Sequence, residues 1–170
     1  AQANSTRIVP GCGFDSVPRD IGAYLLLREM ETRHKQECVR IKSAFTLGGG
    51  GLNGGTLASM MNMIESGQQK MLNDPFLLNP AGSIPTDKKP HRDPLGTHWD
   101  EDFKAWLGLF VMGPVNTRMV RRSLALRGQD TVYQEYLRFG RSLLAGAVAA
   151  SFGVSSKISM GLMAISPLRK

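Results

Sequence analysis

The fold of this chain is constrained most by three short polar stretches, which are residues 10–20, 48–59 and 112–123. Each follows or flanks an apolar run and gathers glycines, amides, hydroxyls or a carboxylate where the backbone is expected to turn. In α/β proteins such turns join strands to helices and line a pocket. The pattern therefore predicts an α/β fold, part of an enzyme, whose functional residues lie in these turns.

The apolar pattern between these turns predicts alternating strands and helices. Pro18 and Asp20 mark the first turn of one helix, and the strand that follows it alternates apolar and polar side chains. The expected elements are a strand at 7–10, a helix from Asp15 or Ser16 to about 34, a strand at 37–47, a helix at 56–65, a strand or short helix at 103–112, and a helix at 116–126 capped by Asn116 or Thr117.

Residues 68–104 show neither a helical nor a strand period and contain five prolines. Such a segment is expected to cross the surface as a long loop, and loops of this length often serve as lids or binding arms. The three histidines have no spacing that would bring them onto one metal ion, so no metal site is predicted. Cys12 and Cys38 are expected to be free thiols in a reducing compartment.

The positive charge lies in the last third of the chain. The net charge is +7; residues 118–170 hold nine Lys or Arg against two Asp or Glu, whereas residues 1–117 are balanced. Nucleic-acid binding is disfavoured, because there is no basic strand interleaved with aromatics, no zinc pattern and no recognition helix. Basic residues beside an apolar segment fit the anionic surface of a membrane better.

The segment 143–170 is apolar, rich in small residues and flanked by basic side chains. Between Leu143 and Leu168 the only charged residue is Lys157, and three glycines and several serines interrupt the stretch. These interruptions argue against a transmembrane helix. Two interpretations stay open: an interfacial segment that contacts a membrane, or a pair of small-residue helices buried against another part of the protein.

The glycine-rich turn contains a G-x-G-x-x-G pattern in Gly49, Gly51 and Gly54. It lies between an expected strand and an expected helix, so a helix N-terminus that holds a phosphate is one interpretation. Six glycines in eight positions match such a pattern easily, and no acidic strand end follows about 20 residues later to hold a ribose. A loop that lets substrate or the far end of a cofactor approach the backbone is favoured.

The three polar stretches together resemble the saccharopine dehydrogenase-like oxidoreductases, a family that includes the trans-acting enoyl reductases. The resemblance runs from about Arg7 to Gly128, with the segment up to Lys170 as its expected continuation. It implies that a Rossmann domain precedes this chain and carries most of the dinucleotide site. Residues 1–142 would then be the second, substrate-side α/β domain with a mixed sheet, and residues 143–170 a small-residue apolar helical tail.

The resemblance also implies which residues form the site. The residues expected at the cofactor, NAD or NADP, are Gly13, Phe14, Asp15 and Ser16, and those expected on the substrate side are Asn53, Gly54, Gly55, Thr56, Asn116 and Arg118. No catalytic residue is assigned. Arg19 stands where a smaller polar residue is common in the family, which leaves the identity of the substrate open.

These residue types suit hydride transfer without a protein nucleophile, because the cofactor carries the chemistry and the protein orients it. Arg118 could hold a carboxylate or phosphate, Asp15 could position an amide, and Ser16, Thr56 or a water could relay a proton. Each role has a structural alternative: Asp15 and Ser16 could be helix caps, and Arg118 could pair with an acid on its helix.

These features predict part of an NAD(P)-dependent oxidoreductase that reduces a double bond or carbonyl of a hydrophobic or lipid-linked substrate. The alternative is a non-catalytic family member that binds a membrane, a lipid droplet or a partner through residues 143–170. The expected location is intracellular, at the periphery of a membrane, mitochondrion or lipid droplet, and a homodimer or larger assembly stays open. Since neither a methionine nor a leader begins the chain, it is interpreted as a piece of a longer protein.

Overall fold

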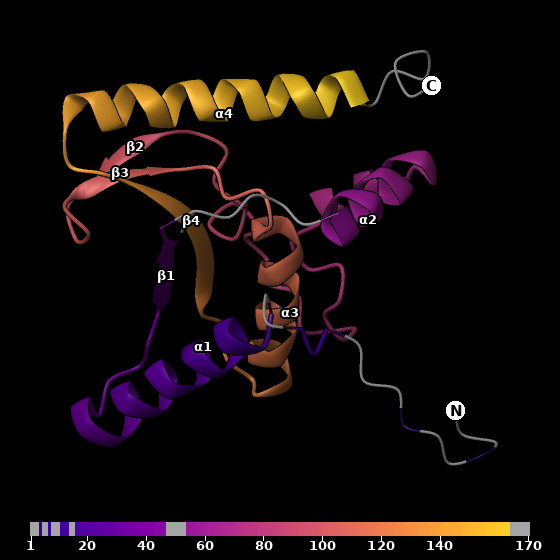
Figure 1. Cartoon of the computed structure of the whole chain (residues 1–170). Coiled ribbons are helices and arrows are strands. Elements are labelled where there is room, and N and C mark those ends of the chain that lie inside the picture. The colour runs from indigo at the N-terminus through magenta and orange to yellow at the C-terminus, as the bar shows by residue number, and fades with distance from the viewer. Residues whose placement is uncertain (1–3, 5–6, 8–10, 14–15, 47–53, 164–170) are drawn as a thin grey trace.

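The computed structural model describes residues 4, 7, 11–13, 16–46 and 54–163. In chain order the elements are α1 (Val17–Glu29), a π-helical turn (Met30–His34), β1 (Arg40–Phe45), α2 (Gly54–Glu65), a 3-10 helix (Gln68–Asn73), β2 (His98–Asp100), β3 (Ala105–Gly108), α3 (Gly113–Leu126), β4 (Val132–Gly140) and α4 (Leu143–Met163) (Figure 1). The fold is α/β, as predicted. Most of the expected strand at 7–10 and the glycine-rich turn at 48–53 lie outside the described residues.

Four strands form one mixed sheet in the order β1-β4-β3-β2. β1 runs parallel to β4, with Ser43 opposite Glu135, and the two remaining pairs are antiparallel. The prediction of a mixed sheet is confirmed. β4 is not among the predicted elements, although it is the strand that joins the parallel and antiparallel parts of the sheet.

α1 begins where Pro18 and Asp20 predict, and the helical path continues through the π-helical turn to His34. Lys35 then adopts a left-handed backbone with φ of 53° and ends the helix. Ser16 occupies the N-cap position, but its side chain makes no capping hydrogen bond. The expected capping role of Ser16 is therefore wrong, because its hydroxyl is engaged with a side chain of α3 instead.

α3 begins at Gly113 rather than at Asn116. Pro114 lies in its first turn, where the fixed φ and the missing N–H of proline suit a helix start. The prediction that Asn116 or Thr117 caps the helix is wrong, since both residues lie inside it and are fully buried. Their side chains are consequently available for contacts with other elements.

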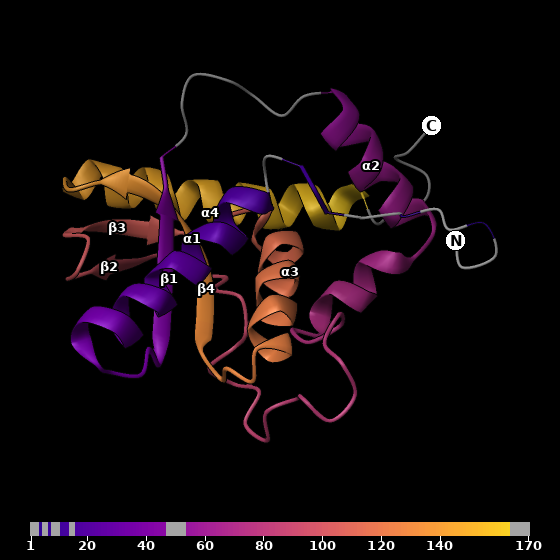
Figure 2. The same ribbon diagram turned by 90° about the horizontal axis from the view of Figure 1, so that it is seen from below.

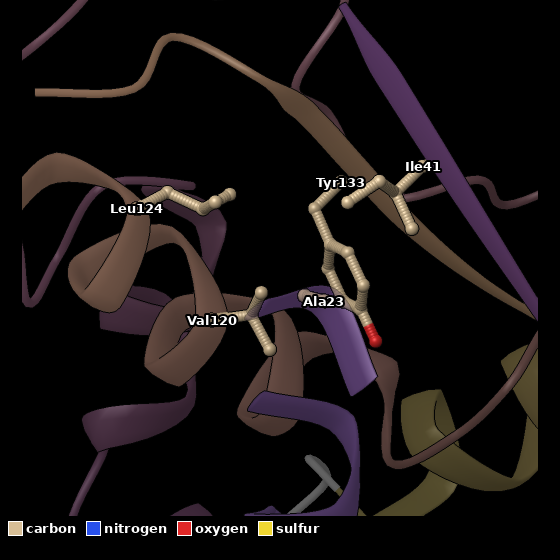
Figure 3. Close-up of a cluster of buried hydrophobic side chains, with 5 residues drawn as sticks. All are labelled: Ala23, Ile41, Val120, Leu124 and Tyr133. Carbon is tan, nitrogen blue, oxygen red and sulfur yellow. The ribbon is translucent and has the colours of Figure 1, made fainter. Parts of the chain in front are cut away.

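The main apolar core lies where α1 and α3 pack on the parallel strands. Figure 3 shows Ala23, Ile41, Val120, Leu124 and Tyr133 around one centre, and each is at most 4% exposed. Burying side chains of the larger sizes stabilises a fold by roughly 1.5–3 kcal/mol each. This contact also fixes the first turns of both helices beside β4, where the candidate site lies.

The proline-rich segment 68–104 has more regular structure than predicted. It contains the 3-10 helix and β2, and between them Phe76 and His91 are buried. Side chains of α3 reach its backbone; for example, Arg122 donates a hydrogen bond to the carbonyl of Leu78 at 2.6 Å. The segment is therefore held against α3.

Residues 143–163 form one helix, α4, rather than the pair of helices that was one expectation. Gly146 allows a close approach to the sheet, because a Cβ there would lie 2.6 Å from the ring of Trp106. Phe152 packs on Phe139 of β4 with 5.7 Å between ring centroids. α4 crosses beside β2 and β3 in Figure 1, and the view from below in Figure 2 places α1 in front of it. No helix within the described ranges has the length and apolar character to cross a membrane.

Candidate functional site

The buried carboxylate of Glu135 is the centre of a polar cluster between β4, α1 and α3. Glu135 is 1% exposed. The Tyr133 hydroxyl donates a hydrogen bond to its Oε1 at 2.8 Å, and the Asn116 amide donates from Nδ2 to its Oε2 at 3.1 Å. Because Tyr133 and Asn116 are also fully buried, the carboxyl group is surrounded by protein and not by bulk water.

α1 supplies the other two members of this cluster. Ser16 Oγ donates to Asn116 Oδ1 at 3.4 Å, and Arg19 Nε lies 3.8 Å from Glu135 Oε1. The Arg19 guanidinium also lies over the ring of Phe45, 4.4 Å from its centroid, a favourable position for a cation. The Glu135 cluster, as we name it, consists of Ser16, Arg19, Asn116, Tyr133 and Glu135.

The local fold explains why these residues meet. The alternation of β4 places Tyr133, Glu135 and Leu137 on one side of the strand, and all three are at most 2% exposed. α1 and α3 bring residues from their first turns, Arg19 and Asn116, to that side. Helix N-termini carry partial positive charge, so this position suits a carboxylate.

Burial raises the pKa of Glu135 above its ordinary value. The hydrogen bonds from Tyr133 and Asn116 and the charge of Arg19 act in the opposite direction but do not cancel the effect of burial. Burial likewise raises the pKa of the Tyr133 hydroxyl, which therefore stays protonated as a donor. The raised pKa of Glu135 thus moves its proton exchange toward neutral pH.

Each protonation state of Glu135 fits a different hydrogen-bond pattern. When Glu135 is ionised, Asn116 turns its N–H group to the carboxylate and its oxygen to Ser16, whose hydroxyl hydrogen then points inward. When Glu135 is protonated, it can donate to Asn116 Oδ1 once the amide rotates by half a turn. The amide then donates to Ser16, and the Ser16 hydroxyl hydrogen no longer points to Asn116. The proton on Glu135 can therefore decide whether Ser16 donates to Asn116 or to another acceptor.

Arg118 lies in a second cluster, although it is only two residues from Asn116. It donates to the carboxylate of Asp93 and to the carbonyl of Leu72, and its Nε donates to the carbonyl of Asp74 at 3.2 Å. All three acceptors belong to the segment 68–104. In the structure Arg118 therefore holds the long loop.

Arg121 completes this second cluster. It donates to Asp93 Oδ1 at 3.2 Å and to the carbonyl of Tyr133 at 3.0 Å. Burial lowers the pKa of Arg121, which the charge of Asp93 opposes. We refer to Asp93, Arg118 and Arg121 as the Asp93 cluster, in which one carboxylate faces two buried guanidinium groups.

The structure brings together two of the predicted site residues, Ser16 and Asn116. Gly13 is exposed, and its carbonyl accepts the N–H groups of Ser16 and Val17 at 3.1 and 3.0 Å. Gly54, Gly55 and Thr56 form the start of α2. Phe14, Asp15 and Asn53 and the side chain of Thr56 lie outside what the structure describes.

Sequence reasoning missed Glu135, Tyr133 and Asp93. Glu135 carried a usable signal: it is one of only two acidic residues after position 117, and it alternates with Tyr133 and Leu137. A charged residue on the apolar side of a strand requires a buried partner. Asp93 carried no such signal, because it is one charged residue among several in an aperiodic segment. Within the described ranges, no three His, Cys, Asp or Glu side chains come together in a way that could hold a metal ion.

No protein-family model matches the chain, and no solved structure matches it significantly. Mycobacterial proteins do match. A Mycobacterium tuberculosis protein provisionally named a trans-acting enoyl reductase is 31% identical over 95% of this chain and 42% of its own length. The trans-acting enoyl reductases of Mycobacterium ulcerans and Mycobacterium leprae are each 31% identical, over 92% and 89% of this chain and 43% and 40% of their own lengths. The chain is homologous to part of these proteins.

This homology supports a relationship to oxidoreductases that reduce a carbon–carbon double bond. The chain spans less than half the length of the relatives that it matches. The resemblance to the wider saccharopine dehydrogenase-like family stays a prediction.

Proposed function

We propose that this chain is the substrate-side part of an NAD(P)H-dependent enoyl reductase that acts on a hydrophobic, lipid-linked acyl group. The observation that carries the proposal is the homology to trans-acting enoyl reductases over most of the chain. The Glu135 cluster adds a chemical reason. It places the Ser16 hydroxyl at the start of α1, and the direction of this hydroxyl depends on the protonation of Glu135.

The cofactor, when bound, supplies a hydride to one carbon of the double bond. The exposure of Gly13 supports its approach there, since a Cβ added at Gly13 would meet no atom of the described residues within 4 Å. We assign the cofactor side to Gly13, Phe14, Asp15 and Ser16, and the substrate side to Asn53, Gly54, Gly55, Thr56 and Asn116. Arg118 is assigned to holding the loop, because Asp93 and loop carbonyls engage its guanidinium.

In this proposal Ser16 lies where the cofactor side meets the substrate side and donates a hydrogen bond to the acyl carbonyl oxygen. Negative charge develops on that oxygen when the hydride adds, and a donor placed there lowers the barrier. Water supplies the proton that the second carbon requires. Glu135 is a positioning residue, because it acts on the substrate only by way of Asn116 and Ser16. Its protonated form leaves the Ser16 hydroxyl free to donate, so activity is expected to fall as pH rises through the raised pKa of Glu135.

The test is reduction of an α,β-unsaturated acyl thioester by the native protein, followed as NADPH or NADH consumption. Ser16→Ala is expected to lower kcat by about 100-fold, the usual cost of one such donor, whereas Ser66→Ala, an exposed residue outside the cluster, should leave it unchanged. Glu135→Gln imitates the protonated acid and should remove the decline at high pH. The absence of nucleotide-dependent reduction in the wild type would contradict the function; an unchanged pH profile in Glu135→Gln would contradict the role of Glu135 alone.

A second candidate function rests on the outward face of α4. Leu144, Val148 and Ile158 recur there at helical spacing and are 74%, 49% and 56% exposed. Exposed apolar side chains on one helix face, with basic residues at its start such as Arg141, suit contact with an anionic lipid surface. We therefore propose that α4 attaches the protein to a membrane or lipid droplet, with or without catalysis.

Vesicle flotation tests this attachment. The double substitution Leu144→Glu with Val148→Glu should abolish flotation with anionic vesicles. Val39→Glu with Leu126→Glu is the matched control, because these apolar residues are also exposed, at 70% and 63%, but lie away from α4. Equal flotation of the two double variants would remove the proposal.

A further inference from the structure

β1 has an open edge on the side away from β4. It is the first strand in the order β1-β4-β3-β2, and within the described residues β4 is the only strand that pairs with it. The N–H of Val132 donates to the carbonyl of Val39, and the parallel register continues from there, so the backbone groups of the odd-numbered residues of β1 point to β4. The N–H and C=O groups that point away from the sheet are those of Arg40, Lys42 and Ala44.

β1 lacks the features by which natural proteins prevent an exposed edge from pairing. Such edges are guarded by proline, by a bulge or by a charged side chain, above all lysine. β1 contains no proline and pairs with β4 in an unbroken register. Its lysine, Lys42, reaches across the sheet, where its Nζ donates to Asp100 Oδ2 at 2.8 Å and to the carboxylate of Asp102. The charge of Lys42 is therefore paired within the chain and does not guard the edge.

The sequence of β1 is complementary to itself in an antiparallel pair. Two registers related by a twofold axis overlap nearly the whole strand, one with the axis at Lys42 and one with the axis at Ser43. The first places two lysines directly opposite each other, which is unfavourable. In the second, the pairs of opposite residues, one from each copy, are Ser43–Ser43, Ile41–Phe45, Lys42–Ala44 and Arg40–Thr46. The register with the axis at Ser43 thus has an apolar pair and no like charges directly opposite.

α1 extends over the space that a second copy would occupy at this edge. In Figures 1 and 2 the C-terminal half of α1 projects beyond β1 on the side away from β4. Leu25 and Leu26 belong to this half and are exposed, at 54% and 51%. A sheet that continues past β1 would run along this part of α1, so a second copy would cover part of its apolar surface.

We propose that the β1 strands of two copies pair antiparallel about a twofold axis at Ser43 and form a dimer with one continuous sheet. Lys42 and Ala44 exchange backbone hydrogen bonds across the interface, because their N–H and C=O groups point outward. The interface borders the Glu135 cluster, since Ser43 lies opposite Glu135 in the register of β1 and β4. The contact uses the same surface of both copies, so it closes as a dimer and leaves no open edge at β1. The proposal does not depend on the reductase activity.

Disulfide cross-linking of the native protein tests the register. In a background with Cys12→Ser and Cys38→Ser, the variant Ser43→Cys should give a cross-linked dimer on mild oxidation, because opposite residues at this position lie about 4.5 Å apart at Cα. Ala44→Cys is the matched control: its two copies would be about 9 Å apart, which is too far for a disulfide. No cross-link through Ser43→Cys, or equal cross-linking of the two variants, would overturn the register.

A proline substitution tests the edge without using cysteine. Ala44→Pro removes an N–H that points away from β4, so each sheet is kept while the hydrogen bond to the second copy is lost. The dissociation constant of the dimer, measured by light scattering over a dilution series, should rise by about tenfold or more, whereas Ala44→Ser keeps the N–H and should leave it unchanged.

Two results would overturn the dimer. One is an unchanged dissociation constant in a folded Ala44→Pro variant, which would place any dimer contact elsewhere. The other is a wild-type protein that stays monomeric at all concentrations. If the Lys42 amide of that monomer is protected from hydrogen exchange, another segment of a longer chain pairs with β1 in place of a second copy.

Discussion

α3 contributes to two buried polar clusters that are organised in opposite ways. In the Asp93 cluster, two guanidinium groups, of Arg118 and Arg121, face one carboxylate and several loop carbonyls. In the Glu135 cluster, neutral donors hold the carboxyl group, and the guanidinium of Arg19 lies 3.8 Å from it. The first arrangement stabilises a loop through one carboxylate that two cations share. The second leaves the acid with a raised pKa, which is the property that a chemical role needs.

The largest effect is expected from removing the carboxylate of the Asp93 cluster. Asp93→Ala would leave two buried guanidinium groups without their common partner, so the free energy of unfolding should fall by about 3–5 kcal/mol. Urea unfolding measures this change. Asp87→Ala, in the same loop but exposed, is the control and should change the free energy by less than about 1 kcal/mol. Equal effects of the two substitutions would show that charge pairing does not hold the loop.

A smaller loss of stability is expected when position 118 keeps its positive charge but loses the planar geometry of the guanidinium. Arg118→Lys retains a cation beside Asp93 but cannot donate to the carbonyls of Leu72 and Asp74 at the same time. The free energy of unfolding should fall by about 1–3 kcal/mol. Arg127→Lys, an exposed substitution just after the end of α3, should cost clearly less. If Arg118→Lys left the free energy of unfolding unchanged, a positive charge at this position would be enough to stabilise the Asp93 cluster, and the geometry of the guanidinium would not matter.

The raised pKa of Glu135 should make the free energy of unfolding depend on pH. Because the pKa of Glu135 is higher in the folded than in the unfolded protein, the folded state holds the proton more tightly. Its contribution to stability is present below the unfolded pKa and is lost as pH rises through the folded pKa. Relative to Glu135→Gln, the free energy of unfolding of the wild type should fall over that range by about 1.4 kcal/mol per unit of difference between the two pKa values. Parallel curves for the two proteins would contradict a raised pKa.

The smallest effect on stability is expected at Ser16. Its hydroxyl makes no helix cap and donates one long hydrogen bond at 3.4 Å, so Ser16→Ala should lower the free energy of unfolding by at most about 1 kcal/mol. Thermal unfolding of wild type and variant measures this. A loss of 2 kcal/mol or more would indicate that Ser16 is chiefly structural, and would weaken its assignment to the site.

Local sequence signals predicted the helices and strands whose form does not depend on packing against other elements. Pro18 and Asp20 located α1, and the alternation after residue 37 located β1. The prediction that Asn116 caps α3 places the start of this helix too late, because Pro114 already fits its first turn. α4 is one helix in spite of its glycines, since Gly146 lets it approach Trp106. A local signal, Pro114, thus fixes the start of α3, whereas packing decides the form of α4.

The candidate site was predicted only in part for the same reason. Ser16 and Asn116 stood out because they lie in polar turns, and the structure brings them together. Their meeting depends on Glu135, which reaches them only once β4 pairs with β1 and the helices pack on it. A contact between residues 100 positions apart cannot be found from local periodicity.

The measurement that tests this account most directly is the pKa of the Glu135 side chain. With ¹³C-labelled glutamate, the carboxyl signal of Glu135 can be identified by its loss in Glu135→Gln and followed by NMR as pH is raised. We predict a midpoint clearly above the ordinary value of 4.5 for a glutamate. A midpoint at or below 4.5 would show that the donors and Arg19 fully stabilise the ionised form, and Glu135 could then not control the hydroxyl of Ser16 near neutral pH.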